Sequence, residues 1–253
     1  MTDRLIARTP CQGISLPRKV KKLVIPLPTG QVLALADSVP RRYRALVLVG
    51  AAAGLRQGEA FGLTLSQLNL DREARLRLPE FRSALVDGRQ INLTQQLVLV
   101  TGKSPYVDDP KTAASVRVIP IPKFLVEALT DHLAEFGVGE DGLIFTDHRG
   151  RPLRRNRFSE MIRPAVKKSS IREGTTFHVL RHYYASLLIR SGASVKTVQN
   201  RLGHESATET LDTYGHLWPD SEERTREAFE KELGGALAQE SEDSLRTGSG
   251  DSA

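Results

Sequence analysis

The spacing of hydrophobic residues changes along the chain, and it predicts helices in two regions with strands between them. An almost continuous apolar run from Ala45 to Ala53 predicts a buried helix that starts after Pro40 and stops at Gly54. Thr29 can cap a shorter helix in front of it. With the other segments of helical periodicity, the predicted helices cover residues 30–37, 41–53, a short segment after Arg56, 123–136, 155–169, 178–191, 194–202, 206–217 and 220–234.

Residues 65–120 have a different pattern, because apolar side chains there alternate with polar ones or form short blocks. This pattern predicts the strands of a small antiparallel sheet, with residues 104–114 as a hairpin or loop between two of them. The predicted fold class is therefore α+β and mainly α, a helical bundle with a small antiparallel β-sheet on one side. The predicted strands cover residues 68–70, 74–78, 90–93, 96–100 and 116–122, and residues 142–145 form a short extended piece.

The two ends of the chain differ in composition from the middle. Residues 1–28 are rich in proline and carry the basic segment PRKVKK, which is typical of a linker. We interpret them as a basic interdomain linker, as though the chain began where a preceding domain would end. Residues 236–253 are dominated by Ser, Glu, Asp and Gly, and we expect them to form a disordered acidic tail. The folded domain is predicted over residues 29–235.

Positive charge is concentrated in one segment. The net charge is +6, and residues 151–203 carry 12 Lys and Arg against 2 Asp and Glu. Residues 204–253 carry 4 and 13, so the last part of the chain is acidic. A basic segment of this kind is typical of a protein that binds a polyanion, although a solvated helix face would give the same composition.

The sequence predicts a protein of a reducing cytoplasm. No apolar run reaches the roughly 18 residues of a membrane span, and the N-terminus lacks the apolar core of a secretory signal. Cys11 is the only cysteine, so no disulfide can form within the chain.

The segment GLRQGE places a cation just after a predicted helix stop. Arg56 would point into a cleft there, and Glu59 three residues later can pair with it and hold its rotamer. An ordinary ion pair within a helix is the alternative. Lys111 lies in the predicted hairpin or loop, from which a lysine could reach a phosphate. A solvated loop lysine is the alternative there, and Lys103 competes for the same role.

Further candidates lie in the stretch from residue 178 to residue 214. His178 shares a helix face with Arg181 and His182. The apolar stripe of this helix anchors it in the core, and because a buried arginine is rare unless it is paired, Arg181 suggests an anion site. Two histidines four residues apart could also bind zinc, but no further ligand is in place, and no metal site is predicted. His204 follows Gly203, which is typical of a helix end, and Tyr214 lies near the end of the next predicted helix. The alternative for His204 is a surface histidine beside a turn, and the alternative for Tyr214 is a tyrosine whose ring packs on the core.

Five segments in this order resemble the tyrosine recombinases, also called phage-type integrases: GLRQGE at 54–59, PKTAASVRVIPIP at 110–122, HVLRH at 178–182, LGH at 202–204 and DTYGH at 212–216. The resemblance implies the catalytic fold of that family. It implies that Arg56 and Arg181 are the catalytic arginines, that Lys111 is the hairpin lysine, and that His178 and His204 are the paired histidines. Tyr214 would be the nucleophile, with Glu59 in support.

The implied activity is site-specific recombination of double-stranded DNA through a 3′-phosphotyrosine, without metal or cofactor. A topoisomerase of the same chemistry and a DNA-binding regulator without activity are the alternatives. The resemblance further implies a homo-tetramer on DNA, with the C-terminal helix docked on a neighbour, and we expect a monomer in isolation. The same resemblance implies a bacterial or phage protein that acts on DNA in the nucleoid. Arg154, Arg155 and Lys167 are expected to hold DNA phosphates on either side of the cut.

Overall fold

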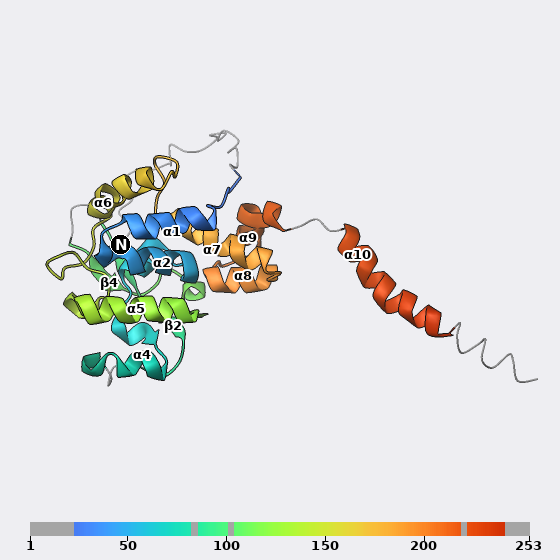
Figure 1. Ribbon diagram of the computed structural model, residues 1–253, viewed down its shortest axis with the longest axis horizontal. Coiled ribbons are helices and arrows are strands. Elements are labelled where there is room, and N and C mark those ends of the chain that lie inside the picture. The colour runs from blue at the N-terminus through green and yellow to red at the C-terminus, as the bar shows by residue number, and fades with distance from the viewer. Residues whose placement is uncertain (1–22, 82–85, 101–103, 219–221, 241–253) are drawn as a thin grey trace, which may run out of the picture.

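The computed structural model describes residues 23–81, 86–100, 104–218 and 222–240, so Cys11, Lys103, most of the predicted linker and residues 241–253 lie outside it. Helices make up most of the fold, as the hydrophobic spacing predicted (Figure 1). The α-helices are α1 (Thr29–Ser38), α2 (Arg41–Ala53), α3 (Gln57–Phe61), α4 (Arg72–Leu76), α5 (Lys123–Phe136), α6 (Arg155–Lys168), α7 (His178–Arg190), α8 (Val195–Leu202), α9 (Ala207–Tyr214) and α10 (Glu222–Phe229).

Helix α2 is the centre of the helical layer and packs against α1, α5 and α7. Its apolar run is buried, and the helix begins after Pro40 and ends at Gly54 in the left-handed conformation, as predicted. Gly50 allows the close approach of α7, because a Cβ atom there would lie 2.7 Å from the ring of Phe177. The buried helix therefore fixes where α7, which carries most of the candidate residues, begins.

The predicted antiparallel pairing is also present. Strands β1 (Leu68–Asn69), β2 (Gln90–Leu93) and β5 (Arg117–Pro120) form a sheet in the order β1-β2-β5, while β3 (Gln96–Val98) pairs with β4 (Tyr106–Asp108). Ile91 of β2 lies opposite Ile119 of β5, and both are fully buried. Strand β5 continues from a short 3-10 turn, Ala113–Ser115, and contacts α8, so the sheet reaches the candidate site.

One prediction for this region was wrong. Residues 74–78 were expected to form a strand, but residues 72–76 form helix α4, because the Asp71 carboxylate accepts a hydrogen bond from Ala74 N and caps its first turn. The alternation of apolar and polar side chains over residues 74–78 favoured a strand, but the helix cap at Asp71 stabilises the helix instead. Residues 104–114 were expected to be a hairpin or loop, and they include strand β4, which forms an antiparallel pair with β3.

The C-terminal elements also differ from the prediction. The helix expected over residues 206–217 ends at Tyr214 and continues as a 3-10 turn, Gly215–Leu217. After α10 the chain forms a short π-helix, Glu230–Gly234, and remains helical to residue 240. Residues 236–240 are part of this helical segment, and their Ala, Leu, Gln and Glu are good helix formers. Figure 1 shows α10 projecting away from the body of the molecule.

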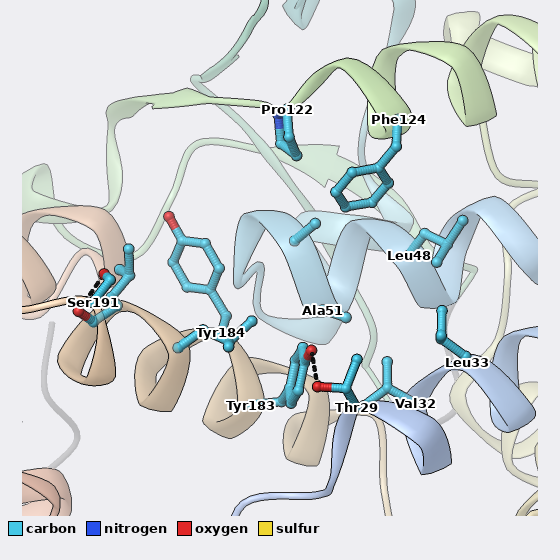
Figure 2. Close-up of a pocket in the computed structure, with 13 residues that line it drawn as sticks. Thr29, Val32, Leu33, Leu48, Ala51, Pro122, Phe124, Tyr183, Tyr184 and Ser191 are labelled. Carbon is cyan, nitrogen blue, oxygen red and sulfur yellow. Dashed lines mark hydrogen bonds between the residues drawn. The ribbon is translucent and has the colours of Figure 1, made fainter.

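An apolar groove of about 580 Å³ lies between α1, α2 and α7 and is also lined by Pro122 and Phe124 at the start of α5. Figure 2 shows Val32 and Leu33 of α1 facing Leu48 and Ala51 of α2 across it. Several of its side chains are open to solvent, among them Leu33 and Phe124 at about half of their surface. Within the described ranges, no helix is both long and apolar enough to cross a membrane.

Candidate active site

Arg56 is placed by the junction of α2 and α3. Gly54 ends α2 with a φ of 64°, and a Cβ atom there would lie 2.3 Å from the ring of Tyr184, so only glycine fits this turn. The Arg56 guanidinium then donates to Ser115 Oγ at 3.3 Å and to Gly203 O at 3.0 Å. Three segments that are far apart in the sequence therefore meet at one cation.

Glu59 holds two arginines rather than one. It accepts from Arg56 Nη1 at 3.1 Å, as the sequence predicted, and it also accepts from Arg117 Nη1 and Nη2 at 3.1 and 2.9 Å. The Glu59 side chain is almost completely buried. Burial alone would raise the pKa of Glu59, but the hydrogen bonds and charge of Arg117, followed by the charges of Arg181 and Arg56, lower it below its ordinary value.

Glu59→Gln is expected to lower the free energy of unfolding by about 3–5 kcal/mol at neutral pH, because the buried guanidinium of Arg117 loses its counter-charge. Because the folded-state pKa of Glu59 lies below 4.5, its contribution is complete above that pH and is lost as the pH falls below it. Denaturant unfolding between neutral pH and pH ~3 measures both effects, and the variant should lose part of the acid sensitivity. Glu73→Gln, at an exposed ion pair, is the control. Equal stability of the two variants would contradict the prediction.

Arg181 is the most deeply buried cation of the site. Its side chain rises from α7, and its Nη1 donates to Gly54 O at 2.8 Å while its Nη2 donates to Leu202 O at 2.6 Å. Only 1% of the residue is exposed. Burial, and then the nearby charge of Arg56, lowers the pKa of Arg181 to about 10, so it remains a cation at neutral pH. Two backbone carbonyls therefore pair with this buried arginine, and the anion site expected there stays a prediction.

His204 follows the end of α8 at Gly203, which is left-handed with a φ of 64°. Its Nδ1 lies 2.8 Å from Thr210 Oγ1, and its Nε2 lies 3.6 Å from Glu209. Burial, and then the charge of Arg181, lowers the pKa of His204 to about 3, so the ring is neutral and the contact with Glu209 is not an ion pair. If Nδ1 accepts from the Thr210 hydroxyl, Nε2 carries the proton and is a donor.

Tyr214 is the last residue of α9, and only 1% of it is exposed. Its Oη lies 2.9 Å from His182 Nδ1, and its ring is parallel to that of His204, with the centroids 6.4 Å apart. Burial raises the pKa of Tyr214 to about 12, although Arg181 opposes this shift. The His178 ring packs against the His182 ring, with the two ring centroids 4.6 Å apart, and makes no hydrogen bond to the phenol oxygen. The structure therefore brings an imidazole to the phenol, but that imidazole belongs to His182.

The remaining predicted residues lie outside this cluster. Lys111 follows β4, is exposed, and makes no hydrogen bond to the residues that the structure describes. Arg154 and Arg155 stand at the start of α6 and Lys167 at its last turn, and all three are exposed. Arg154 lines an open cleft of about 900 Å³, together with further arginines: Arg149, Arg151 and Arg157.

The sequence of residues 72–220 matches the phage integrase family, which is more than half of the chain. The chain belongs to the phage integrase family. Its similar proteins include the tyrosine recombinase XerD of Halalkalibacterium halodurans, 28% identical over 86% of this chain and 65% of that protein. The putative prophage phiRv2 integrase of Mycobacterium tuberculosis is 30% identical over 83% of this chain and 52% of that protein. This phage integrase family member thus spans roughly half to two thirds of the length of these relatives.

The fold is that of solved members of the same family. The Tn1549 transposon integrase, in a complex with circular intermediate DNA, superposes with a TM-score of 0.66 at 22% identity, over 84% of this chain and 68% of that chain. The XerA recombinase superposes with a TM-score of 0.56 at 22% identity, over 86% of this chain and 66% of that chain. The α+β, mainly helical fold class predicted from the sequence is confirmed.

Two residues of this family member's site were not predicted from the sequence. Arg117 lies in the quoted segment PKTAASVRVIPIP, but a single arginine in a short strand gave no sign that it would be buried against Glu59. His182 was considered only as half of a zinc pair, although it lies next to Arg181. The spacing places residues 178 and 182 on one helix face but does not say what that face contacts. In the described residues, no three His, Cys, Asp or Glu side chains gather where they could hold a metal ion.

Proposed function

We propose that this chain is the catalytic part of a site-specific DNA recombinase, which cuts and rejoins duplex DNA through a 3′-phosphotyrosine. The observation that carries the proposal is the convergence of Arg56, Arg181, His204 and the Tyr214 phenol around one small volume, although they come from four different elements. A phosphodiester carries one negative charge, and two arginines that stay charged suit it. The names of the similar proteins, recombinase and integrase, point in the same direction.

In this mechanism Tyr214 Oη attacks a backbone phosphate in line, and the 5′ oxygen leaves. Arg56 and Arg181 donate to the non-bridging oxygens and offset the charge that develops in the transition state. His204 donates to the same phosphate through Nε2. Lys111, which is exposed on the loop after β4, protonates the departing 5′ oxygen. The phosphotyrosine ester conserves the bond energy, so a 5′-hydroxyl of a partner strand can reverse the attack without ATP.

The substrate is double-stranded DNA. The exposed cations at the two ends of α6, Arg154, Arg155 and Lys167, would hold phosphates that flank the cut. Each such contact releases counterions, so removing one should reduce the slope of log affinity against log salt by about 0.9. A protein that works on DNA in this way belongs in the cytoplasm, on the nucleoid of a bacterium or phage host.

Covalent capture tests the function directly. The probe is a pool of nicked duplexes with randomised sequence around the nick, because a short fragment beyond the nick diffuses away and traps the protein on the DNA. A denaturant-resistant adduct supports the proposal and also reveals the preferred sequence. Relaxation of supercoiled plasmid without a paired site would favour the topoisomerase alternative. DNA binding without any adduct at any salt concentration would favour a regulator and reject both enzymes.

We further propose that copies of the chain assemble on DNA by docking the segment after Trp218 into the apolar groove of a neighbour. The helical segment that begins with α10 projects from the body of the molecule (Figure 1). Phe229 and Leu233 lie one turn apart on it, and about 60% of each is exposed. The groove between α1, α2 and α7 offers an apolar surface of matching chemistry (Figure 2). Exposed apolar patches of this kind typically mark protein contacts. A helix folded back on its own chain is the alternative.

Leu233→Glu is expected to weaken assembly on the captured duplex by about 30-fold, because burial of one leucine contributes about 2 kcal/mol. Leu33→Glu, on the groove side, should have the same effect. Sedimentation with labelled duplex measures the number of protein copies per DNA. Lys231→Gln, an exposed change in the same segment, is the control. Native assembly by both apolar variants would exclude this interface, and loss in Leu233→Glu alone would favour a helix folded in cis.

A further inference from the structure

The Tyr214 phenol has one hydrogen-bond partner among the described residues, and that partner is His182. The Nδ1 and Oη atoms are 2.9 Å apart, and the two rings meet edge to face, with their centroids 5.6 Å apart. The Tyr214 side chain is buried, and His182 is half-buried beside it. The catalytic histidines of the family resemblance are His178 and His204, and neither has a hydrogen bond to this oxygen.

The protonation states fix the direction of this hydrogen bond. Burial, and then the proximity of His178 and Arg181, lowers the pKa of His182 to about 4, so its imidazole is neutral at pH 7. The Tyr214 phenol is protonated at the same pH, because burial raises its pKa to about 12. The phenol therefore donates and His182 Nδ1 accepts, which leaves the imidazole proton on Nε2. A neutral acceptor is thus already aligned with the proton that the nucleophile must lose.

We propose that His182 is the general base that takes the Tyr214 proton during attack on DNA and returns it during religation; the inference rests on the function proposed above. In the forward step the Oη–P bond forms as the Oη–H bond breaks, and the proton goes to Nδ1 of His182. The P–O5′ bond breaks at the same time, and the 5′ oxygen takes a proton from a separate acid, for which Lys111 is the candidate. The reverse step restores the phenol from the imidazolium.

The charges of the pocket explain why the transfer would wait for DNA. The groups that face His182 are His178 and Arg181 from its own helix and Tyr214 from α9, so burial and these neighbours disfavour an imidazolium. A bound phosphodiester brings a negative charge to Arg181 and Arg56, which offsets the cations that depress the basicity of the ring. Tyrosinate would then form only while a phosphate is in place to react with it.

The relative positions of the two histidines assign them different tasks. His182 contacts the reacting oxygen, whereas His178 reaches it only through the His182 ring, against which it lies edge to face. His178 is also exposed at the surface, even though partial desolvation and the charges of Arg181 and Arg56 lower the pKa of its imidazole. His178 can therefore contact DNA or exchange protons with water, while His182 serves the phenol.

The test compares the native chain with His182→Asn and His182→Ala on the pool of nicked duplexes. Asparagine retains a hydrogen-bonding group on a side chain of similar reach, so it preserves packing, but it cannot take up the proton. Both variants should form the adduct about 100-fold more slowly at pH 7, while their affinity for the nicked duplex stays unchanged. They should also lack the limb of the pH–rate profile on which the native rate falls as the pH decreases. Arg190→Gln, an exposed change at the end of the same helix, should keep the native rate and profile.

The outcomes separate this inference from the proposed function. Slow variants without the acid limb support the assignment, and added imidazole that speeds up His182→Ala supports it further. If His182→Asn forms the adduct within about threefold of the native rate, or keeps the native acid limb, His182 does not carry the proton and the inference fails alone. If the native chain forms no adduct with any duplex of the pool, the proposed function fails and this inference fails with it.

Discussion

Tyr214→Phe is expected to abolish the covalent protein–DNA adduct, with a fall in rate of at least about 10³-fold, because phenylalanine has no oxygen to attack the phosphate. The fold should survive the change. The ring keeps its buried place beside His204, and only the hydrogen bond to His182 is lost, which costs about 1 kcal/mol. Denaturing gel electrophoresis of labelled nicked duplex measures the adduct, and thermal unfolding measures the fold.

Tyr183→Phe is the matched control for this experiment. Tyr183 is also buried, lies on α7, and has a hydroxyl that makes one hydrogen bond, to Thr29 Oγ1 at 3.0 Å. The two variants therefore lose the same group and a similar amount of stability. Only Tyr214→Phe should lose the adduct. An adduct that persists in Tyr214→Phe, mapped by peptide sequencing to another side chain, would show that the nucleophile has been misassigned.

Most of the helical framework followed from the sequence because its signals are local. Pro40 and Gly54 bound α2 where the apolar run predicted, since proline suits the start of a helix and glycine suits its left-handed end. Helix α5 was predicted with the bounds that the structure shows. The signals failed where a segment was short. In residues 74–78 an alternating pattern suggested a strand, and the side-chain cap at Asp71 decided for a helix.

The site was only partly predictable, because its partners are distant in the sequence. The cation at Arg56 and its partner Glu59 are three residues apart, and this pair was predicted correctly. Nothing local shows that Arg117 fills the other side of the same carboxylate across 58 residues. The contact between His182 and Tyr214 likewise depends on how α9 packs on α7, which no spacing within either helix reveals. The role of Lys111 remains a prediction from the family resemblance.

Arg181→Lys is expected to slow adduct formation by about 10²- to 10³-fold at saturating DNA, the usual cost of removing one donor that stabilises a transition state. Arginine has five N–H donors, of which two hold Gly54 O and Leu202 O, so the others remain for a phosphate. A lysine ammonium cannot bridge two carbonyls and also meet two phosphate oxygens. The charge is kept in the variant, so the experiment isolates the geometry of the guanidinium.

Stability must be separated from catalysis in this variant, because one of the two buried carbonyls loses its donor. The expected loss is about 1–3 kcal/mol, and rates are therefore compared at a temperature where thermal unfolding shows both proteins folded. Arg190→Lys, exposed at the end of the same helix, should keep both the rate and the stability. If Arg181→Lys instead kept the native rate while losing stability, Arg181 would serve only to join α7 to the ends of α2 and α8. The phosphate would then depend on Arg56 alone, and a pocket of one cation would be too weakly charged for the proposed chemistry.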